Sequence, residues 1–536
     1  MQKLFINGEI LTMRREDDRP EAVLVENGKI RFVGSRGDAE ALCRADCETV
    51  DLQGRTLLPA FIDPHSHISM AAQFAEYADL SGCGDFDDII ETLRAYRDAR
   101  KVGQYGIVIG YGYDHNFLKE GRHPDKGVLD RVATDVPVYI FHTSSHMGVA
   151  NTKLLELADI DARTPDPQGG RFGRLNGSME PDGYIEETGA MAQVLTKVFP
   201  RMAGDPAARL EKVQSLYLEN GITTVQDGAA SADNVRDAVA FAEAGKWKVD
   251  VVSYIVVQEN PREVFAEYPE YDGRYRNRYK LGGCKIVLDG SPQGRSAWLS
   301  RPYEGETEYC GYPVFRDDEV DAYVRACVED GRQLLAHCNG DAAADQFLRA
   351  YRRAVEHSEN PDRMALRPVM IHCQTVRQDQ LDEMAALHMI PSMFVSHVYY
   401  WGDVHVKNLG RDRAAHISPA RSALARGLTV NFHQDTPVVP PDMLHTVWCA
   451  VNRFTRGGEV LGGEERISVF EALKAVTCNA AYAYFEESRK GTIEAGKLAD
   501  LVILDQNPLA CEQLKIRDIA VCETIKEGIT VYRKDA

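Results

Sequence analysis

The segment LPAFIDPHSHIS, residues 58–69, decides the fold that we predict for this chain. An apolar run is interrupted by Pro64, and histidines follow at positions 65 and 67. Because alternate side chains of a strand point to one face, His65 and His67 can share a cavity at the end of a strand. The pattern therefore predicts a buried strand that carries two imidazoles able to face one divalent metal.

Seven further apolar segments follow along the chain, short and rich in β-branched residues. Helix-length stretches separate them, which is typical of βα units on a parallel sheet. They are GITTVQDG (221–228), VDVVSYIVV (249–257), GCKIVLDG (283–290), RQLLAHCNG (332–340), RPVMIHCQ (367–374), MIPSMFV (389–395) and LTVNFHQD (428–435). With the first segment they make eight units. We therefore predict an α/β fold, a (β/α)8 TIM barrel over residues 58–486, whose site lies at the carboxyl ends of its strands.

Both ends of the chain differ from this middle part, because short β-like runs alternate there with turn signals. Asn-Gly dipeptides at 7–8 and 27–28 favour two-residue hairpins. The same style returns in GTIEAGKLADLVILD (491–505) and ETIKEGITVYRK (523–534). We predict one small β-sandwich domain, built from residues 1–57 and 487–536.

A long interval separates His67 from the second barrel segment. It holds strand-like pieces of its own, YGIVIGYGYD (105–114) and VPVYIFHTSSH (136–146). We predict a large insertion after the first barrel strand, over about residues 83–200. Loops on that face of a barrel commonly govern access and specificity.

The composition excludes several classes of protein. The 536 residues carry a net charge of −19, spread along the chain, which disfavours nucleic acid and anionic membranes as partners. The sequence shows neither a secretory signal nor an apolar run long enough to span a membrane, so we expect a cytoplasmic protein. Twelve cysteines without a C-x-x-C pair indicate free thiols.

Polar residues stand at the carboxyl end of five of the eight segments. They are His65, His67, Lys285, His337, His372 and Asp435. Four histidines and an aspartate on one rim are costly to bury without partners, and a metal satisfies them together. Lys285 is a poor ligand as an ammonium, but a carbamate formed with carbon dioxide is a bridging carboxylate. An ion pair between Lys285 and Asp289 is the alternative.

On these residues the chain resembles the amidohydrolase superfamily, and within it the amidohydrolase family 3 group of metal-dependent hydrolases that includes N-substituted formamide deformylase. Further motifs carry the resemblance over nearly the whole chain. They are KIVLDGSPQGR (285–295), AHCNGDAA (336–343), IHCQ (371–374) and QDTPV (434–438). The resemblance implies two divalent metal ions bridged by carboxylated Lys285. His65, His67 and Asp435 would hold one ion, and His337 and His372 the other.

The resemblance also implies an activity, the hydrolysis of an amide or N-substituted formamide bond of a small molecule. Zinc is the default metal, with manganese, iron or cobalt as alternatives. A hydroxide between two ions about 3.5–4 Å apart is the expected nucleophile. Asp435 is the expected general base and later acid. His146 or His397 is expected to hold the oxyanion.

The predicted insertion adds candidates for a substrate pocket through the segments YGYDHN (111–116) and SSHMGVAN (144–151). The candidates are Tyr113, Asp114, His146, Asn151, Arg295 and Trp401. Trp401 belongs to an aromatic group after the seventh strand, for which core packing is an equal explanation. The resemblance to this family also implies a homodimer.

Other functions remain open. Lactone, ester or organophosphate hydrolysis can use the same metal pair. Deamination is disfavoured, because single-metal deaminases of the superfamily commonly place Glu three residues after the strand-5 histidine, and Gly340 stands there after His337. A noncatalytic binding or regulatory protein would have lost ligands, whereas all six positions are intact. The sequence identifies neither the acyl group nor the amine of the substrate.

Overall fold

The computed structural model describes residues 2–103, 105–198 and 205–534. An eight-stranded parallel sheet forms its centre, and neighbouring strands follow one another in chain order. The strands are β7 (Phe61–Ile62), β14 (Ile222–Ala230), β15 (Asp250–Val256), β16 (Tyr279–Val287), β17 (Gln333–Cys338), β18 (Val369–His372), β19 (Ile390–Met393) and β20 (Asn431–Phe432). Each overlaps one of the eight predicted segments, although β14 ends two residues later than predicted and β16 begins four residues earlier. The prediction of a parallel α/β sheet is confirmed.

The sheet curls until the chain after its last strand meets the chain after its first. The backbone N–H of Asp435 donates to the carbonyl of His65 at 3.2 Å, and that of His67 donates to the carbonyl of Thr436 at 2.8 Å. The sheet is therefore TIM-barrel-like, and the carboxyl ends of its strands share one rim.

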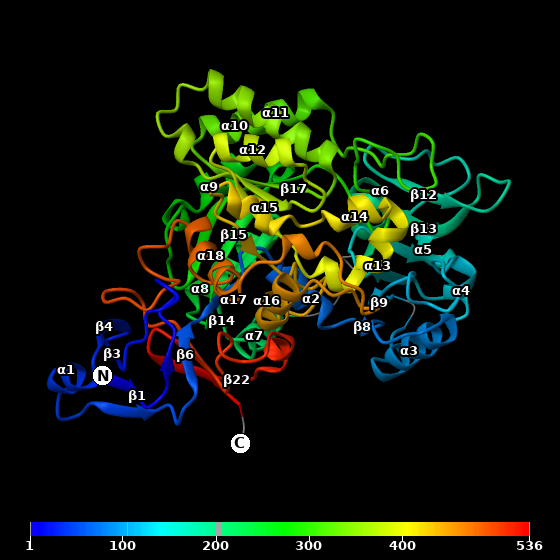
Figure 1. Ribbon diagram of the computed structural model, residues 1–536. Helices are drawn as coiled ribbons and strands as arrows, with labels where there is room; N and C mark the ends of the chain where they lie inside the picture. Colours follow the sequence, from blue (N-terminus) through cyan, green and yellow to red (C-terminus); the bar gives the residue numbers. More distant parts are fainter. Residues whose placement is uncertain (1, 104, 199–204, 535–536) are drawn as a thin grey trace.

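Helices follow the strands and pack around the curled sheet (Figure 1). They include α7 (Pro206–Leu218), α8 (Ala232–Glu243), α9 (Pro261–Glu267), α10 (Asp317–Glu329), α11 (Asp341–His357), α12 (Gln378–Ala386), α13 (His397–Leu409), α14 (Arg411–Ala415), α15 (Ala420–Ala425), α16 (Met443–Asn452), α17 (Val469–Ala475) and α18 (Cys478–Ala483). In α8, the Ser231 hydroxyl caps the first turn by accepting the N–H of Asn234 at 3.2 Å. Its buried residues recur three and four positions apart, at Val235, Ala238, Val239 and Ala242. That stripe faces the core.

The segment quoted first is divided between two sheets. Strand β6 (Thr56–Pro59) pairs antiparallel with β21 (Leu501–Leu504), so that Leu58 lies opposite Val502. Only Ala60 separates β6 from β7. The predicted extended run is present, but its first residues belong to a terminal sheet. Both sheets bury apolar side chains, so hydropathy alone could not place the boundary.

The two ends of the chain form two small sheets. One has the order β4-β3-β1-β5 and the other β2-β6-β21-β22-β23. Their remaining strands are β1 (Gln2–Ile6), β2 (Glu9–Ile10), β3 (Ala22–Glu26), β4 (Lys29–Gly34), β5 (Glu48–Asp51), β22 (Val521–Lys526) and β23 (Ile529–Arg533), and α1 (Arg36–Ala41) follows β4. Phe5 and Val23 of the first sheet share a buried cluster with Leu57, Leu501 and Ile503 of the second.

One of the two predicted Asn-Gly hairpins is present. Asn27 and Gly28, with φ of 52° and 80°, join the antiparallel strands β3 and β4. The prediction at residues 7–8 is wrong, because this turn carries the chain from one sheet to the other. Strand β1 pairs with β3 and β5, whereas β2 pairs in parallel with β6.

A separate six-stranded sheet follows the first barrel strand and α2 (Ile68–Phe74), in the order β12-β13-β11-β10-β9-β8. Its elements are β8 (Ala78–Asp79), α3 (Phe86–Ala99), β9 (Val108–Tyr113), α4 (Lys126–Asp130), β10 (Val138–His142), β11 (Met147–Ala150), α5 (Thr152–Leu157), β12 (Arg171–Arg174), β13 (Pro181–Glu186) and α6 (Glu187–Val198). We call this part the insertion. It lies on the other side of the barrel from the terminal sheets (Figure 1).

The predicted end of the insertion near residue 200 lies outside the described residues. Both strand-like pieces predicted within it are strands, β9 and β10. In the described parts of the chain, no helix has both the length and the apolar character that a membrane crossing needs.

Candidate metal centre

The six predicted metal ligands gather on the carboxyl rim of the curled sheet. They are Lys285 on β16, His337 on β17, His372 at the end of β18, His65 and His67 after β7, and Asp435 after β20. All are buried except His67, which is partly buried. Neighbouring strands thus bring together residues that lie far apart in the chain.

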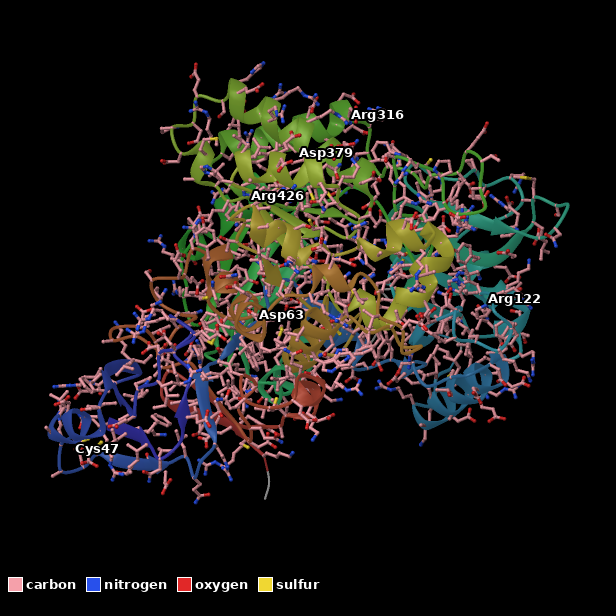
Figure 2. The ribbon with its side chains drawn as sticks, in the orientation of Figure 1. Cys47, Asp63, Arg122, Arg316, Asp379 and Arg426 are labelled. Carbon is pink, nitrogen blue, oxygen red and sulfur yellow. The ribbon has the colours of Figure 1, made fainter. Side chains whose placement is uncertain are left out.

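A turn after β7 presents the two histidines of the first segment. The sequence suggested that these histidines lie on the strand itself. The strand ends at Ile62, however, and the histidines lie beyond it. Asp63 is fully buried in the middle of the molecule (Figure 2) and accepts the N–H of His65 at 3.2 Å. The ring centroids of His65 and His67 are 4.9 Å apart. A turn, and not the strand, places Nε2 of both rings near Oδ1 of Asp435.

Asp435 lies among three of these imidazoles. Its Oδ1 is 3.3 Å from Nε2 of His65 and 3.2 Å from Nε2 of His67. Its Oδ2 is 3.9 Å from Nε2 of His372. Burial alone would raise the pKa of Asp435, but the histidines outweigh burial and hold the pKa well below 3.8. Asp435 is therefore a charged carboxylate, the form that binds a cation.

Gln226 on β14 fixes the orientation of His65. Its Nε2 donates to the carbonyl of Pro64 at 2.6 Å, so its Oε1 remains to accept the hydrogen of His65 Nδ1, also at 2.6 Å. With that hydrogen on Nδ1, the lone pair of Nε2 faces Asp435. Burial and the nearby Lys285 lower the pKa of His65 to about 3, which keeps the ring neutral.

Asp289 holds His337 in the same way, with Oδ1 3.1 Å from Nδ1 of the ring. Its carboxylate also accepts three backbone N–H groups at 2.7–3.0 Å, those of Trp298, Asn339 and Gly340. Among the described residues, no ion pair joins Asp289 to Lys285. The ion-pair alternative for Lys285 is therefore not what the structure shows.

Lys285 is buried at this centre, with Nζ 3.5 Å from Nε2 of His65. Burial lowers the pKa of Lys285 to about 8, although the Asp435 carboxylate opposes this shift. Ligand atoms of His65, His372 and Asp435 lie within 4.8 Å of one another. Imidazole and carboxylate donors are those that zinc and similar divalent ions bind. The residues present therefore fit a metal.

A second group of metal-ligand type lies in the insertion. It consists of Asp114, His115 and His142, with ligand atoms also within 4.8 Å. The indole N–H of Trp401 donates to Asp114 at 2.8 Å. Nδ1 of His142 accepts the backbone N–H of Ser144 at 3.1 Å, so a ring hydrogen stands on Nε2, 3.4 Å from Asp114. A protonated nitrogen binds no metal, so we interpret this group as a hydrogen-bond network between the insertion and α13.

Two predicted pocket residues belong to the interior of the insertion. Asn151 is fully buried and uses its whole amide, accepting from Val138 and Leu154 and donating to Ala133 and Val136. Tyr113 is fully buried, and its hydroxyl lies 3.0 Å from Nδ1 of His123. The prediction that these two residues contact substrate is corrected, because their polar groups are already used inside the insertion.

Two further pocket candidates and one catalytic candidate also have protein partners. Arg295 forms an ion pair with Glu306 at 2.9 Å. Trp401 is 2% exposed and packs against Phe394. Nδ1 of His397 lies 3.1 Å from Nε2 of His405. These contacts account for Arg295 and Trp401 without a ligand.

His146, by contrast, reaches the centre from the insertion. Its ring centroid is 5.0 Å from that of His337. Its Nδ1 lies 2.7 Å from Oε2 of the buried Glu187. Burial opposes a charge on His146, but the carboxylate of Glu187 outweighs burial and raises the pKa above 6.5.

Sequence reasoning missed the roles of Gln226 and Glu187. Glu187 follows a stretch rich in glycine, proline and aspartate, where no periodic pattern marks a functional residue. Pairing of β11 with β13 sets Met147 opposite Glu186 and so brings Glu187 beside His146. Only knowledge of that register could have identified it.

The TIM-barrel-like sheet and the candidate metal centre on its rim are those of a metal-dependent hydrolase. The sequence model of the amidohydrolase family matches residues 48–532, and the chain belongs to this family. It is thus a hydrolase that acts on carbon–nitrogen bonds.

Known relatives are similar to this chain over nearly its full length. The N-substituted formamide deformylase of Arthrobacter pascens is 30% identical, covering 99% of this chain and 98% of the relative. The putative amidohydrolase YtcJ of Bacillus subtilis is 26% identical over 100% of both chains. An uncharacterized metal-dependent hydrolase from Pyrococcus horikoshii has a similar fold, with a TM-score of 0.76 and 24% identity over 96% of this chain and 99% of that one.

Proposed function

We propose that this chain hydrolyses an amide or N-substituted formamide bond of a small molecule at a centre of two divalent metal ions, with zinc as the default metal. The observation that carries the proposal is the position of Asp435, within 3.9 Å of three imidazole nitrogens from two separate segments of the chain. The deformylase of Arthrobacter pascens, 30% identical, supports the choice of bond.

His65, His67 and Asp435 would hold one ion, and His337 and His372 the other. Lys285 would bridge them after reaction with carbon dioxide. In that reaction the amine nitrogen bonds to the carbon of carbon dioxide and loses a proton, which leaves a carbamate. Two ions bound there would lower the pKa of a coordinated water and polarise a substrate carbonyl.

Asp435 is the proposed general base. The histidines around it keep it ionised at neutral pH, so it can accept a proton from the attacking water. It would then deliver that proton to the leaving amine. The imidazole of His146 faces the same centre from the insertion, where it would stabilise the developing oxyanion. His397 is the less favoured candidate for this role, because its Nδ1 faces His405.

We propose that the insertion controls access and that the terminal sheets form a β-sandwich that supports the barrel. A cavity of about 360 Å³ lies between α2, the insertion and the chain after Asp435. Apolar side chains of Phe74, Val438 and Val439 line part of it, which suits a substrate with an apolar group. A cytoplasmic location and a homodimer remain predictions.

The test combines elemental analysis with a substrate screen. Protein purified without chelator is expected to contain about two metal ions per chain. It should hydrolyse members of a panel of formamides and amides faster than matched lactones and phosphotriesters. Hydrolysis of only lactones or phosphotriesters would replace the proposed bond with an ester. One metal per chain and ammonia release from an aminated heterocycle would favour deamination, and no metal and no turnover would favour a noncatalytic protein.

A further inference from the structure

The insertion carries a buried carboxylate to the metal centre. Glu187 is the first residue of α6, and its side chain is fully buried. Its Oε2 lies 2.7 Å from Nδ1 of His146, and its backbone N–H donates to the carbonyl of His146, also at 2.7 Å. Side chain and backbone thus both join Glu187 to His146.

The surroundings of Glu187 are shaped around its carboxylate. Glu187 has a φ of 63°, in the left-handed region that residues other than glycine seldom occupy. A Cβ at position 290 would collide with Oε1 of Glu187 and with the hydroxyl of Ser296, so only Gly290 leaves room for them. Gly290 directly follows Asp289, which holds His337. One loop therefore supports a metal ligand and also accommodates Glu187.

The other nitrogen of His146 has no such partner. Its Nε2 makes no hydrogen bond to any residue that the structure describes, although the ring lies beside His337. Because Glu187 accepts the hydrogen on Nδ1, rotation of the ring is restricted and Nε2 stays directed away from Glu187.

We propose that Glu187 is a positioning residue, which holds His146 so that Nε2 contacts the carbonyl oxygen of the amide substrate. This inference rests on the proposed function and deepens it. The site is complete only when the insertion supplies this histidine–glutamate pair to the barrel rim. Glu187 itself does not touch the substrate.

The neighbouring Glu186 provides a matched control. It is also buried, but its carboxylate bonds to the hydroxyl groups of Tyr184 and Tyr312 at 2.6 and 2.7 Å and to Arg171 at 2.8 Å. Glu186→Gln thus removes a buried charge from the same segment without altering the partner of His146.

The first experiment measures amide hydrolysis by metal-loaded, full-length variants. Glu187→Ala and His146→Ala should each lower kcat about 100-fold, the scale of one lost oxyanion contact. Glu187→Gln should lose less, because its amide oxygen still accepts from Nδ1. The double variant Glu187→Ala/His146→Ala should be no slower than His146→Ala alone, while Glu186→Gln keeps the wild-type kcat. Metal content should be unchanged in all of them.

Two results would overturn the proposal. One is a double variant whose loss equals the product of the two single losses, because Glu187 would then act independently of His146. The other is a wild-type kcat in Glu187→Ala. Where Glu187→Ala does not fold, Gly290→Ala replaces it, since the added methyl group should displace the carboxylate and reproduce the loss.

A second measurement needs no substrate. Proton spectra of protein labelled with ¹⁵N-histidine should show a strongly downfield Nδ1 proton of His146. The signal should vanish in His146→Ala and Glu187→Ala and persist in Glu186→Gln. Its persistence in Glu187→Ala would refute the pairing. If the wild-type protein hydrolyses no amide, the proposed function fails, and this signal still decides whether Glu187 orients His146.

Discussion

The side-chain oxygen of Gln226 lies 2.6 Å from Nδ1 of His65, and this contact decides which nitrogen of the ring faces the metal centre. Such partners of metal-binding histidines set the tautomer and the basicity of the ligand. The centre therefore depends on an amide that is itself no ligand.

Changing Gln226 to Met should weaken metal binding about 10- to 100-fold, because His65 loses the acceptor that keeps its hydrogen on Nδ1. Competition with a chelating dye measures the affinity. Gln214→Met is the control, since Gln214 is equally buried but bonds to Lys246 and Lys248. An unchanged affinity in the Gln226 variant would contradict the assigned role.

Changing Asp435 to Asn should lower kcat about 10²- to 10⁴-fold, the usual contribution of a general base. The amide cannot accept the proton of the attacking water, while its size matches that of the carboxyl group. Steady-state kinetics at equal metal content measures the loss. The exposed Asp412→Asn should behave as wild type. Turnover close to wild type in Asp435→Asn would exclude this residue as the base.

Reconstitution of metal-free protein should depend on pH and bicarbonate. Only the neutral amine of Lys285 reacts with carbon dioxide, and burial lowers the pKa of this lysine to about 8. The neutral fraction rises with pH, so zinc uptake in bicarbonate should increase with pH, with a midpoint near that value. Uptake measured in buffer freed of carbon dioxide should be slow. A response in Lys285→Ala equal to wild type would disprove the carbamate.

Asp250 makes a separate contribution, to stability at the other end of the sheet. Its Oδ2 lies 2.6 Å from the ammonium groups of both Lys490 and Lys526, and all three residues are buried. In Asp250→Asn the two ammonium groups lose their shared carboxylate, although Glu486 still pairs with Lys490 and Asp500 with Lys526. The loss should cost up to about 3–5 kcal/mol in urea unfolding at neutral pH. Asp233→Asn, in an exposed pair with Arg236, should cost less than about 1 kcal/mol.

The difference in unfolding free energy between wild type and Asp250→Asn should vary with pH. Burial alone would raise the pKa of Asp250, but Lys490 and Lys526 outweigh burial and lower it. A carboxylate with a lowered folded pKa stabilises the fold above its unfolded pKa near 4, and this contribution is lost as pH falls through the folded value. The gap between wild type and Asp250→Asn should therefore narrow below about pH 4. A constant gap down to strongly acidic pH would contradict this assignment.

The histidines of the insertion should bind no metal. His115→Ala is expected to leave the metal content of purified protein unchanged, because His142 directs a hydrogen-bearing nitrogen into that group. His65→Ala, in contrast, should reduce the content measured in the same way. Loss of one metal ion per chain in His115→Ala would show a third site.

Much of the fold could be predicted from the sequence, because each barrel unit repeats a short apolar strand followed by a helix-length stretch. The eight apolar segments matched the eight strands, and ligands at their ends met because parallel strands finish on one rim. The boundary inside residues 58–69 was not readable, since both adjoining sheets bury apolar side chains.

The insertion shows where such reasoning fails. Asn151 and Tyr113 have the polar groups of binding residues, but hydrogen bonds formed on folding use them. Glu187 gave no signal, because its role depends on the register of β11 and β13. Residues whose roles depend on pairing between distant segments cannot be identified from hydropathy or spacing.

The single residue between β6 and β7 also has a mechanical consequence. From Pro59 to His65 the chain is too short to absorb a displacement, and hydrogen bonds fasten it on both sides, through Ala60 to Asp500 and through Phe61 to Gly221. Force applied to the terminal sheets would thus reach the first metal ligand directly. A tether that pulls on those sheets should therefore lower the rate of turnover, and the size of the decrease under a known force would measure the stiffness of this junction.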